Sequence, residues 1–193
     1  MRIVPLLPIL LFFTVSASAA GIREFSVPTL ERLGNELTRA SQRPDRGASD
    51  PIRKRAIETA AAALKGKLFE AQYDYVVLSD PDGKRLLVYA LASLESSTGV
   101  VLAGHFRVTV SADARKAERV DALSKSFASS GPIQPDAVAL FVIQLVSNKP
   151  VETLVYTANL AKKPIYVGTP DGKRWIVKDG KMHVVASKPN KKN

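Results

Sequence analysis

Residues 73–91 read YDYVVLSDPDGKRLLVYAL, and this stretch decides the fold. Apolar positions recur with a period of two on both sides of the segment 80–83, which is typical of paired strands. Pro81 presets φ for a turn, and Gly83 accepts a left-handed conformation without steric cost. The sequence therefore predicts a β-hairpin.

The strand pattern continues beyond this hairpin. Residues 100–110 predict a third strand. The segment 111–129 fits a helix by the spacing of Ala117, Val120, Leu123 and Phe127, and it equally fits a turn at 112–114 followed by a strand at 117–123. We favour the strand, because another hairpin is the shortest connection within a meander.

Two helices are expected before the hairpin. Residues 26–40 form an amphipathic pattern with Ser26 as a possible N-cap, and the polar segment 41–50 is a predicted linker. Asp50 and Pro51 then suit the start of a helix over 51–71. Its apolar stripe consists of Ile52, Ala56, Ile57, Ala60, Ala61, Leu64 and Leu68.

The C-terminal third predicts a second group of strands. A linker at 128–136 precedes an antiparallel meander over 137–186, with a central strand at 138–146 and further strands at 153–160, 165–167, 175–178 and 182–186. The basic tail 187–193 is expected to be disordered. The predicted fold class is α+β, with N-terminal helices packed on antiparallel meanders of roughly nine strands and the helix 51–71 covering one side.

Residues 1–19 have the composition of an export signal. Arg2 precedes an apolar run over 3–15, and Ala17-Ser18-Ala19 gives the small-x-small pattern of a signal-peptidase site. The run is short for a membrane span of about 20 residues, so an uncleaved anchor is the lesser alternative. The sequence predicts a periplasmic or secreted soluble protein without a transmembrane segment in its mature chain.

Composition narrows the possible chemistry. The chain has no cysteine, which excludes disulfides, thiolate nucleophiles and a lipoprotein anchor. His105 and His183 alone make a poor metal set, because catalytic zinc needs about three protein ligands. No cofactor is expected. The net charge of +10 suits an anionic envelope component as partner, while Lys173, Arg174 and Trp175 together are too few to indicate nucleic-acid binding.

One basic cluster is hard to explain by folding alone. Arg53, Lys54 and Arg55 lie in the predicted first helical turn, where cations oppose the helix dipole. With Lys65 and Lys67 they form a candidate partner-binding patch for an anion. A solvated helix face is the alternative interpretation.

The leading functional hypothesis is a non-enzymatic binding or accessory protein of unknown partner, either an anionic component or another protein. A hydrolase with His105 as general base is one alternative, although the sequence contains neither Gly-x-Ser-x-Gly nor Ser-x-x-Lys. An inhibitor or assembly subunit that pairs through an exposed sheet edge is the other.

Overall fold

A computed structural model of the protein describes residues 21–43, 50–69, 71–94 and 99–185. These residues contain the helices α1 (Val27–Ser41), α2 (Pro51–Leu64) and α3 (Glu152–Ala161). The strands are β1 (Gln72–Ser79), β2 (Arg85–Ser93), β3 (Val101–Ala103), β4 (Phe106–Ser111), β5 (Ala117–Ala122), β6 (Ala128–Ser129), β7 (Leu140–Ile143), β8 (Ile165–Gly168), β9 (Arg174–Lys178) and β10 (Lys181–Val184). The predicted α+β fold class is confirmed.

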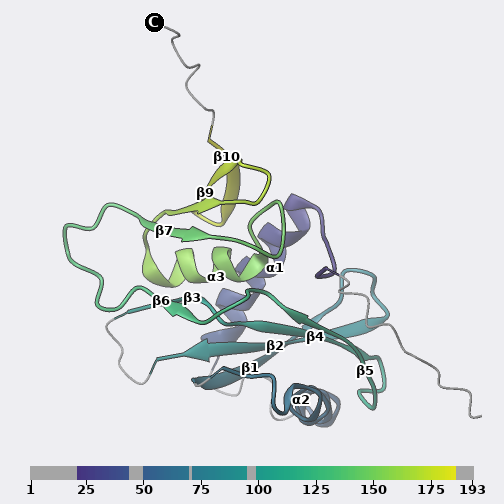
Figure 1. The fold of residues 1–193 in the computed structure, drawn as a ribbon. Coiled ribbons are helices and arrows are strands. Elements are labelled where there is room, and N and C mark those ends of the chain that lie inside the picture. Colours follow the sequence, from purple (N-terminus) through teal and green to yellow (C-terminus); the bar gives the residue numbers. More distant parts are fainter. Residues whose placement is uncertain (1–20, 44–49, 70, 95–98, 186–193) are drawn as a thin grey trace, which may run out of the picture.

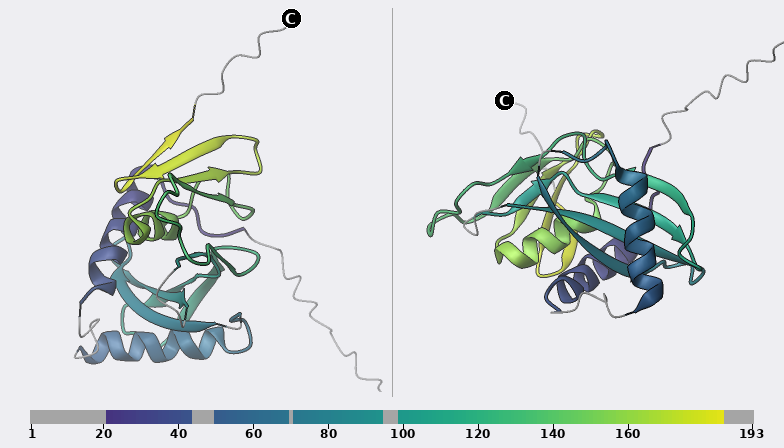
Figure 2. Two further views of the ribbon diagram at one scale, coloured as in Figure 1. Left: turned by 90° about the vertical axis from the view of Figure 1, so that its left-hand side faces the viewer. Right: turned by 90° about the horizontal axis from the view of Figure 1, so that it is seen from below.

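The elements stack in four layers (Figures 1 and 2). Helix α2 covers one face of an antiparallel sheet of order β1-β2-β4-β5, and α1 with α3 covers the other. A second sheet of order β10-β9-β8-β7 lies beyond α1 and α3. A short two-stranded sheet, formed by β3 and β6, contacts the first sheet at β2. The two four-stranded sheets thus share the layer formed by α1 and α3.

The predicted hairpin is confirmed as β1 and β2. Their register runs from Gln72 opposite Ser93 to Ser79 opposite Leu86. At the turn, the Gly83 N–H donates to the Asp80 carbonyl at 2.8 Å, and Gly83 has φ of 74°. In the segment 111–129, the prediction of a strand is confirmed. The strand is β5, which pairs antiparallel with β4.

The third strand is interrupted. Gly104, with φ of 118°, lies between β3 and β4. A side chain there would meet the Phe127 ring at 2.9 Å. Because the chain bends at this point, β3 leaves the first sheet and pairs with β6, inside the predicted linker 128–136. The helix expected over 51–71 is also shorter, ending at Leu64, and Gly66 follows with φ of 74°.

The prediction of an all-antiparallel second meander over 137–186 is wrong. Residues 153–160, expected as a strand, belong to helix α3, which connects β7 to β8 as parallel neighbours. The segment contains β-branched residues, which are typical of strands. It nevertheless forms a helix, which is buried on most sides between the two sheets. The predicted central strand 138–146 is the short strand β7, and it lies at the edge of the sheet.

One core joins the two sheets. Leu33 and Leu37 of α1 and Val155 of α3 pack with residues of both sheets, from Tyr89 in β2 to Val177 in β9. A second cluster lies under α2 around Ala56, Ala60 and Leu64. The predicted signal 1–19, the linker residues 44–49 and the tail 187–193 lie outside the described residues.

Candidate binding groove

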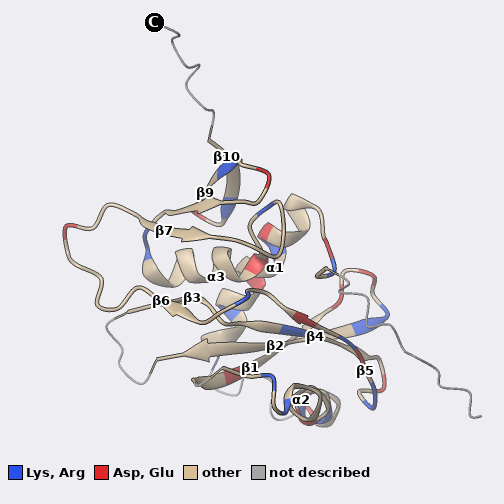
Figure 3. Ribbon diagram, viewed as in Figure 1, with Lys and Arg blue, Asp and Glu red and all other residues tan. Residues whose placement is uncertain are grey.

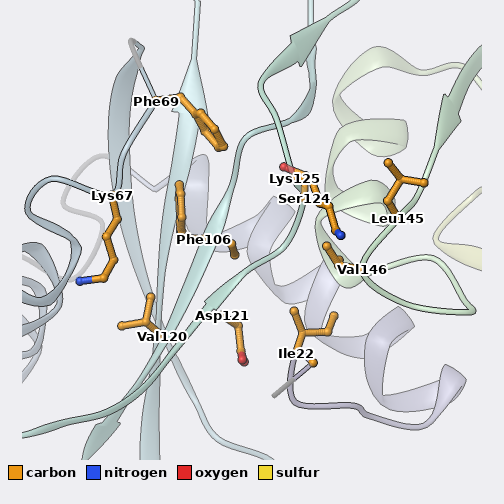
Figure 4. A pocket seen from close by; sticks show the side chains of 12 residues that line it. Ile22, Lys67, Phe69, Phe106, Val120, Asp121, Ser124, Lys125, Leu145 and Val146 are labelled. Carbon is orange, nitrogen blue, oxygen red and sulfur yellow. The ribbon is translucent and has the colours of Figure 1, made fainter. Parts of the chain in front are cut away.

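A groove of about 740 Å³ runs beside β5, an edge strand of the first sheet (Figure 4). It is bounded by the loop after α2, by the N-terminal segment and by the chain after β7. Its lining comprises Gly21, Ile22, Lys67, Phe69, Phe106, Val120, Asp121, Ala122, Ser124, Lys125, Leu145 and Val146.

Apolar side chains make up much of the groove. Phe69 and Phe106 are in ring contact, with centroids 5.6 Å apart. The loop that carries Phe69 is held by Tyr73, whose hydroxyl accepts from the Phe69 N–H at 3.2 Å and donates to the Gly104 carbonyl at 3.0 Å. Leu145, on the opposite wall, remains 54% exposed. The groove therefore presents hydrocarbon to solvent.

Two lysines stand at this apolar surface. Lys67 donates from Nζ to the Ala63 carbonyl at 2.8 Å, which satisfies an acceptor at the end of α2. Lys125 is exposed, and its ammonium has no hydrogen bond or ion pair to the part of the chain that the structure describes. Figure 4 shows both side chains at the groove, with the Lys67 ammonium turned away from Phe106 and Val120 and the Lys125 ammonium toward Val146.

The one carboxylate in the lining, that of Asp121, is neutralised by cations. Arg107 donates to its Oδ2 from Nε at 3.1 Å and from Nη2 at 2.8 Å, while Arg119 donates to Oδ1 at 2.6 Å. Asp121 is only 2% exposed. The charge of Asp121 is therefore paired with cations inside the protein. Lys67 and Lys125 give the groove a net positive charge.

Arg107 is the centre of a buried network that spans three strands and a helix. Strand register places it opposite Tyr89 on β2 and Asp121 on β5. From the first turn of α3, Glu152 Oε1 accepts from Arg107 Nη1 at 2.5 Å and from the Tyr89 hydroxyl at 2.8 Å. Burial and the Glu152 charge raise the pKa of Tyr89 well above 10. Burial disfavours the Arg107 charge, but Glu152, Tyr89 and Asp121 outweigh it and raise the pKa of Arg107.

Residues 21–25 form an N-terminal strap across this network. Arg107 Nη2 donates to the Arg23 carbonyl at 2.5 Å, and the Arg23 N–H donates to Asp121 at 3.2 Å. The Arg23 guanidinium pairs with Asp80 at 2.5 and 2.9 Å. The Phe25 ring lies 4.6 Å from the Arg23 guanidinium and 4.7 Å from that of Arg107. The strap thereby fixes Gly21 and Ile22 as one wall of the groove.

The structure does not gather the predicted basic patch into one site. Arg53 is turned back onto the protein, donating to the Val77 carbonyl at 3.2 Å and lying 3.6 Å from Asp50. Lys54 and Arg55 are exposed on the first turn of α2. Lys65 and Lys67 follow the other end of the helix, roughly 15 Å away along its axis. Only Lys67 of these five residues lines the groove.

His105, the candidate general base, is a core residue with 2% exposure. Its Nδ1 accepts from the Ala92 N–H at 3.0 Å, and its Nε2 has no hydrogen-bond partner. Burial lowers its pKa to about 4. Ser124, nearby, is engaged by the Gly104 N–H at 2.7 Å and donates to the Ser126 carbonyl at 2.9 Å. No nucleophile-base hydrogen bond therefore involves His105 in the described residues.

Sequence reasoning missed most of the groove because its lining comes from distant segments. Ile22, Phe69 and Leu145 share no local pattern, and only their tertiary placement makes them neighbours. Arg107 did carry a signal, since it is the single charge within the apolar stretch 100–110. A charged residue in a strand that lies between two neighbouring strands indicates a buried partner of opposite charge.

Among the described residues, no cluster of three potential metal ligands occurs and no helix has the length and apolarity needed to cross a bilayer. Comparison of the chain with protein families, curated proteins and solved structures gives no match.

Proposed function

We propose that this is an exported, non-enzymatic binding protein whose groove takes an amphiphilic anion, a phosphate or carboxylate attached to a hydrocarbon chain. The observation that carries the proposal is the pairing of an apolar groove with Lys67 and Lys125 beside it, while Asp121 is already neutralised. An ammonium attracts the anionic head, and burial of the chain supplies the larger hydrophobic contribution.

The size of the groove agrees with such a ligand. Its volume of about 740 Å³ falls within the roughly 300–1,000 Å³ of typical small-molecule sites. The hydroxyl of Ser124 is occupied by two backbone groups, so the groove lining offers no free nucleophile at that position. These features support binding rather than hydrolysis.

Export is the second part of the proposal. It is supported by residues 1–19, whose charged start, apolar run and Ala17-Ser18-Ala19 have the order of a signal peptide. An extracytoplasmic location would bring the groove into contact with lipids and other amphiphiles of the envelope.

Calorimetric titration with dodecyl phosphate, kept below its micelle-forming concentration, tests the ligand class. We expect Lys125→Gln and Lys67→Gln each to weaken binding by about threefold to tenfold, because each removes a partly screened attraction of about 0.6–1.4 kcal/mol. Lys54→Gln is the matched control, since it removes the same charge from the exposed first turn of α2.

Two ligand controls separate the head from the chain. Butyl phosphate should bind at least tenfold more weakly than dodecyl phosphate. Dodecyl maltoside should lose only the attraction of the lysines, and its affinity should not change in Lys67→Gln or Lys125→Gln. The proposal fails if Lys54→Gln reduces affinity as much as Lys125→Gln, because attraction would then reflect net charge alone.

A further inference from the structure

Strand β7 is an unpaired sheet edge with an apolar surface. Of the four edge strands in the two four-stranded sheets, β1 contains Asp74, β5 three charged residues and β10 Lys181, whereas β7 contains none. Figure 3 shows β7 without a charged residue. Proteins usually guard such edges with charge or proline, yet residues 137–146 contain neither.

The backbone of β7 has donors to offer. Leu140 and Gln144 donate their N–H groups to Pro164 and Gly168 on the β8 side, both at 2.8 Å. Because successive residues of a strand point their N–H groups to opposite sides, those of Phe141 and Ile143 face the unpaired edge. No strand of the described residues pairs with that edge.

The outer face of the same sheet continues the apolar surface. Register aligns Phe141, Tyr166 and Ile176 in one row across β7, β8 and β9. Phe141 is 60% exposed, Ile143 61% and Tyr166 42%. Phe141 and Ile143 both lie over Gly168, where a Cβ would be 3.9 and 4.0 Å from them. The opposite face, with Val167 and Val177, is the buried one.

Cations flank this row. Alternation along β9 places Arg174 and Lys178 on the same face as Ile176. Lys178 has only the distant Asp179 at 3.8 Å, and no carboxylate of the described residues pairs with Arg174. A second copy of the chain, stacked on this face by twofold symmetry, would bring like charges together. A partner with acidic residues beside its apolar ones complements the surface.

We infer that β7 and the adjoining outer face bind an extended segment of another protein, with alternating apolar side chains and acidic flanks. The segment adds to the sheet as a fifth strand. Its backbone accepts hydrogen bonds from Phe141 and Ile143, and its apolar side chains cover Phe141, Ile143 and Tyr166. None of these three residues lines the groove beside β5, although Leu145 of that groove follows β7 by two residues, and the ligand is of a different kind.

Selection from a phage-displayed library of random nine-residue peptides tests the inference, followed by affinity measurement on the selected peptides. We expect them to alternate apolar residues and to be enriched in Asp and Glu. Binding should slow amide hydrogen exchange at Phe141 and Ile143. Ile143→Pro removes one edge donor without touching the ladder to β8, and should weaken binding at least tenfold.

Two further variants keep the test decisive if proline disturbs the strand. Phe141→Ser with Ile143→Ser changes only exposed side chains and should also abolish binding, while Arg174→Gln with Lys178→Gln should weaken it and reduce its salt dependence. Val184→Ser, at an exposed apolar residue of the far edge strand β10, is the control and should bind normally.

Peptides that bind Ile143→Pro equally well, or that lack acidic enrichment, would overturn the inference. So would a dimer in sedimentation that Ile143→Pro dissociates, because the occupant would then be a second copy.

Discussion

At the scale of single residues, Arg107 decides how the parts of the molecule meet. Its guanidinium is fully buried and donates to Asp121, to Glu152 and to the backbone of the strap. A buried charge is tolerated only when its partners are in place. Arg107 therefore couples the first sheet, helix α3 and residues 21–25 in a single arrangement.

Replacing Arg107 by methionine should cost about 3–5 kcal/mol of unfolding free energy, because it leaves the carboxylates of Asp121 and Glu152 short of a partner in the interior. Urea denaturation measures the loss. Adding Glu152→Gln to the variant should restore part of it, since one of the uncompensated charges is removed. Arg115→Met, at an exposed position, should change stability by no more than about 0.5 kcal/mol. A similar small effect for Arg107→Met would contradict the role given to the network.

His105 should make stability depend on pH. Burial lowers its pKa from 6.5 to about 4, so between these values the unfolded chain binds a proton that the folded protein does not. The contribution of the buried, neutral His105 to the free energy of unfolding is fully present above about pH 6.5. It falls by about 3 kcal/mol as the pH is lowered toward 4.

His105→Asn tests this dependence, because the amide oxygen can still accept from the Ala92 N–H. We expect urea unfolding of the variant to show a flatter decline between pH 6.5 and 4 than the wild type. His183→Asn, at an exposed position, should leave the decline unchanged. If both variants follow the wild-type curve, burial of the neutral imidazole is not its source.

At the scale of elements, the sequence predicted structure well where local chemistry is strong. The hairpin at Gly83 and the helix start at Asp50, whose carboxylate accepts from the Ile52 N–H at 2.8 Å, both follow from turn and cap residues. Helix α3 lacks such signals. It starts without a side-chain cap at Val151 and ends at Lys162 in a left-handed conformation more usual for glycine. Helix α3 is buried on most sides because the two sheets enclose it. Those sheets come from distant parts of the chain, so the residues of the helix alone do not indicate this burial.

The crossing of α1 and α3 depends on Gly34. A Cβ there would lie 2.4 Å from Val155 Cβ and 2.5 Å from the Glu152 carbonyl oxygen, and neither can rotate away. Gly34→Ala should therefore destabilise the protein by about 1–3 kcal/mol, although alanine favours helices. Thermal unfolding measures the effect. Gly21→Ala is the control, because a Cβ at Gly21 meets nothing within 4 Å. An unchanged or raised Tm for Gly34→Ala would contradict this close packing.

At the scale of the whole molecule, the strap brings the start of the described chain onto its most buried charges. Arg23 and Phe25 contact the network only a few residues after the predicted cleavage point at Ala19. The sequence predicts a leader and shows a basic charge, but neither indicates that the residues after the predicted leader form one wall of the groove. That feature arises from pairings across about 60 to 100 residues of chain.

Cleavage after Ala19 should give a mature protein that begins at Ala20, and intact-mass measurement on the extracytoplasmic fraction of a bacterial host checks it. Ala19→Arg should leave the precursor uncut, because the site requires a small residue there. Ser18→Leu alters the unrestricted middle position and should still be processed. Recovery of the full 193-residue chain from the cytoplasm would contradict export.

The most direct test of the proposed function is NMR spectroscopy with a stearate carrying a nitroxide label on its chain. We expect the label to broaden the amide signals of Phe69, Val120 and Val146, and we expect Lys125→Gln to weaken the effect while Lys54→Gln does not. Signals of β10, at the opposite edge of the second sheet from β7, should be broadened least. Broadening centred on β7, or spread evenly over the surface, would show that the groove beside β5 is not the ligand site.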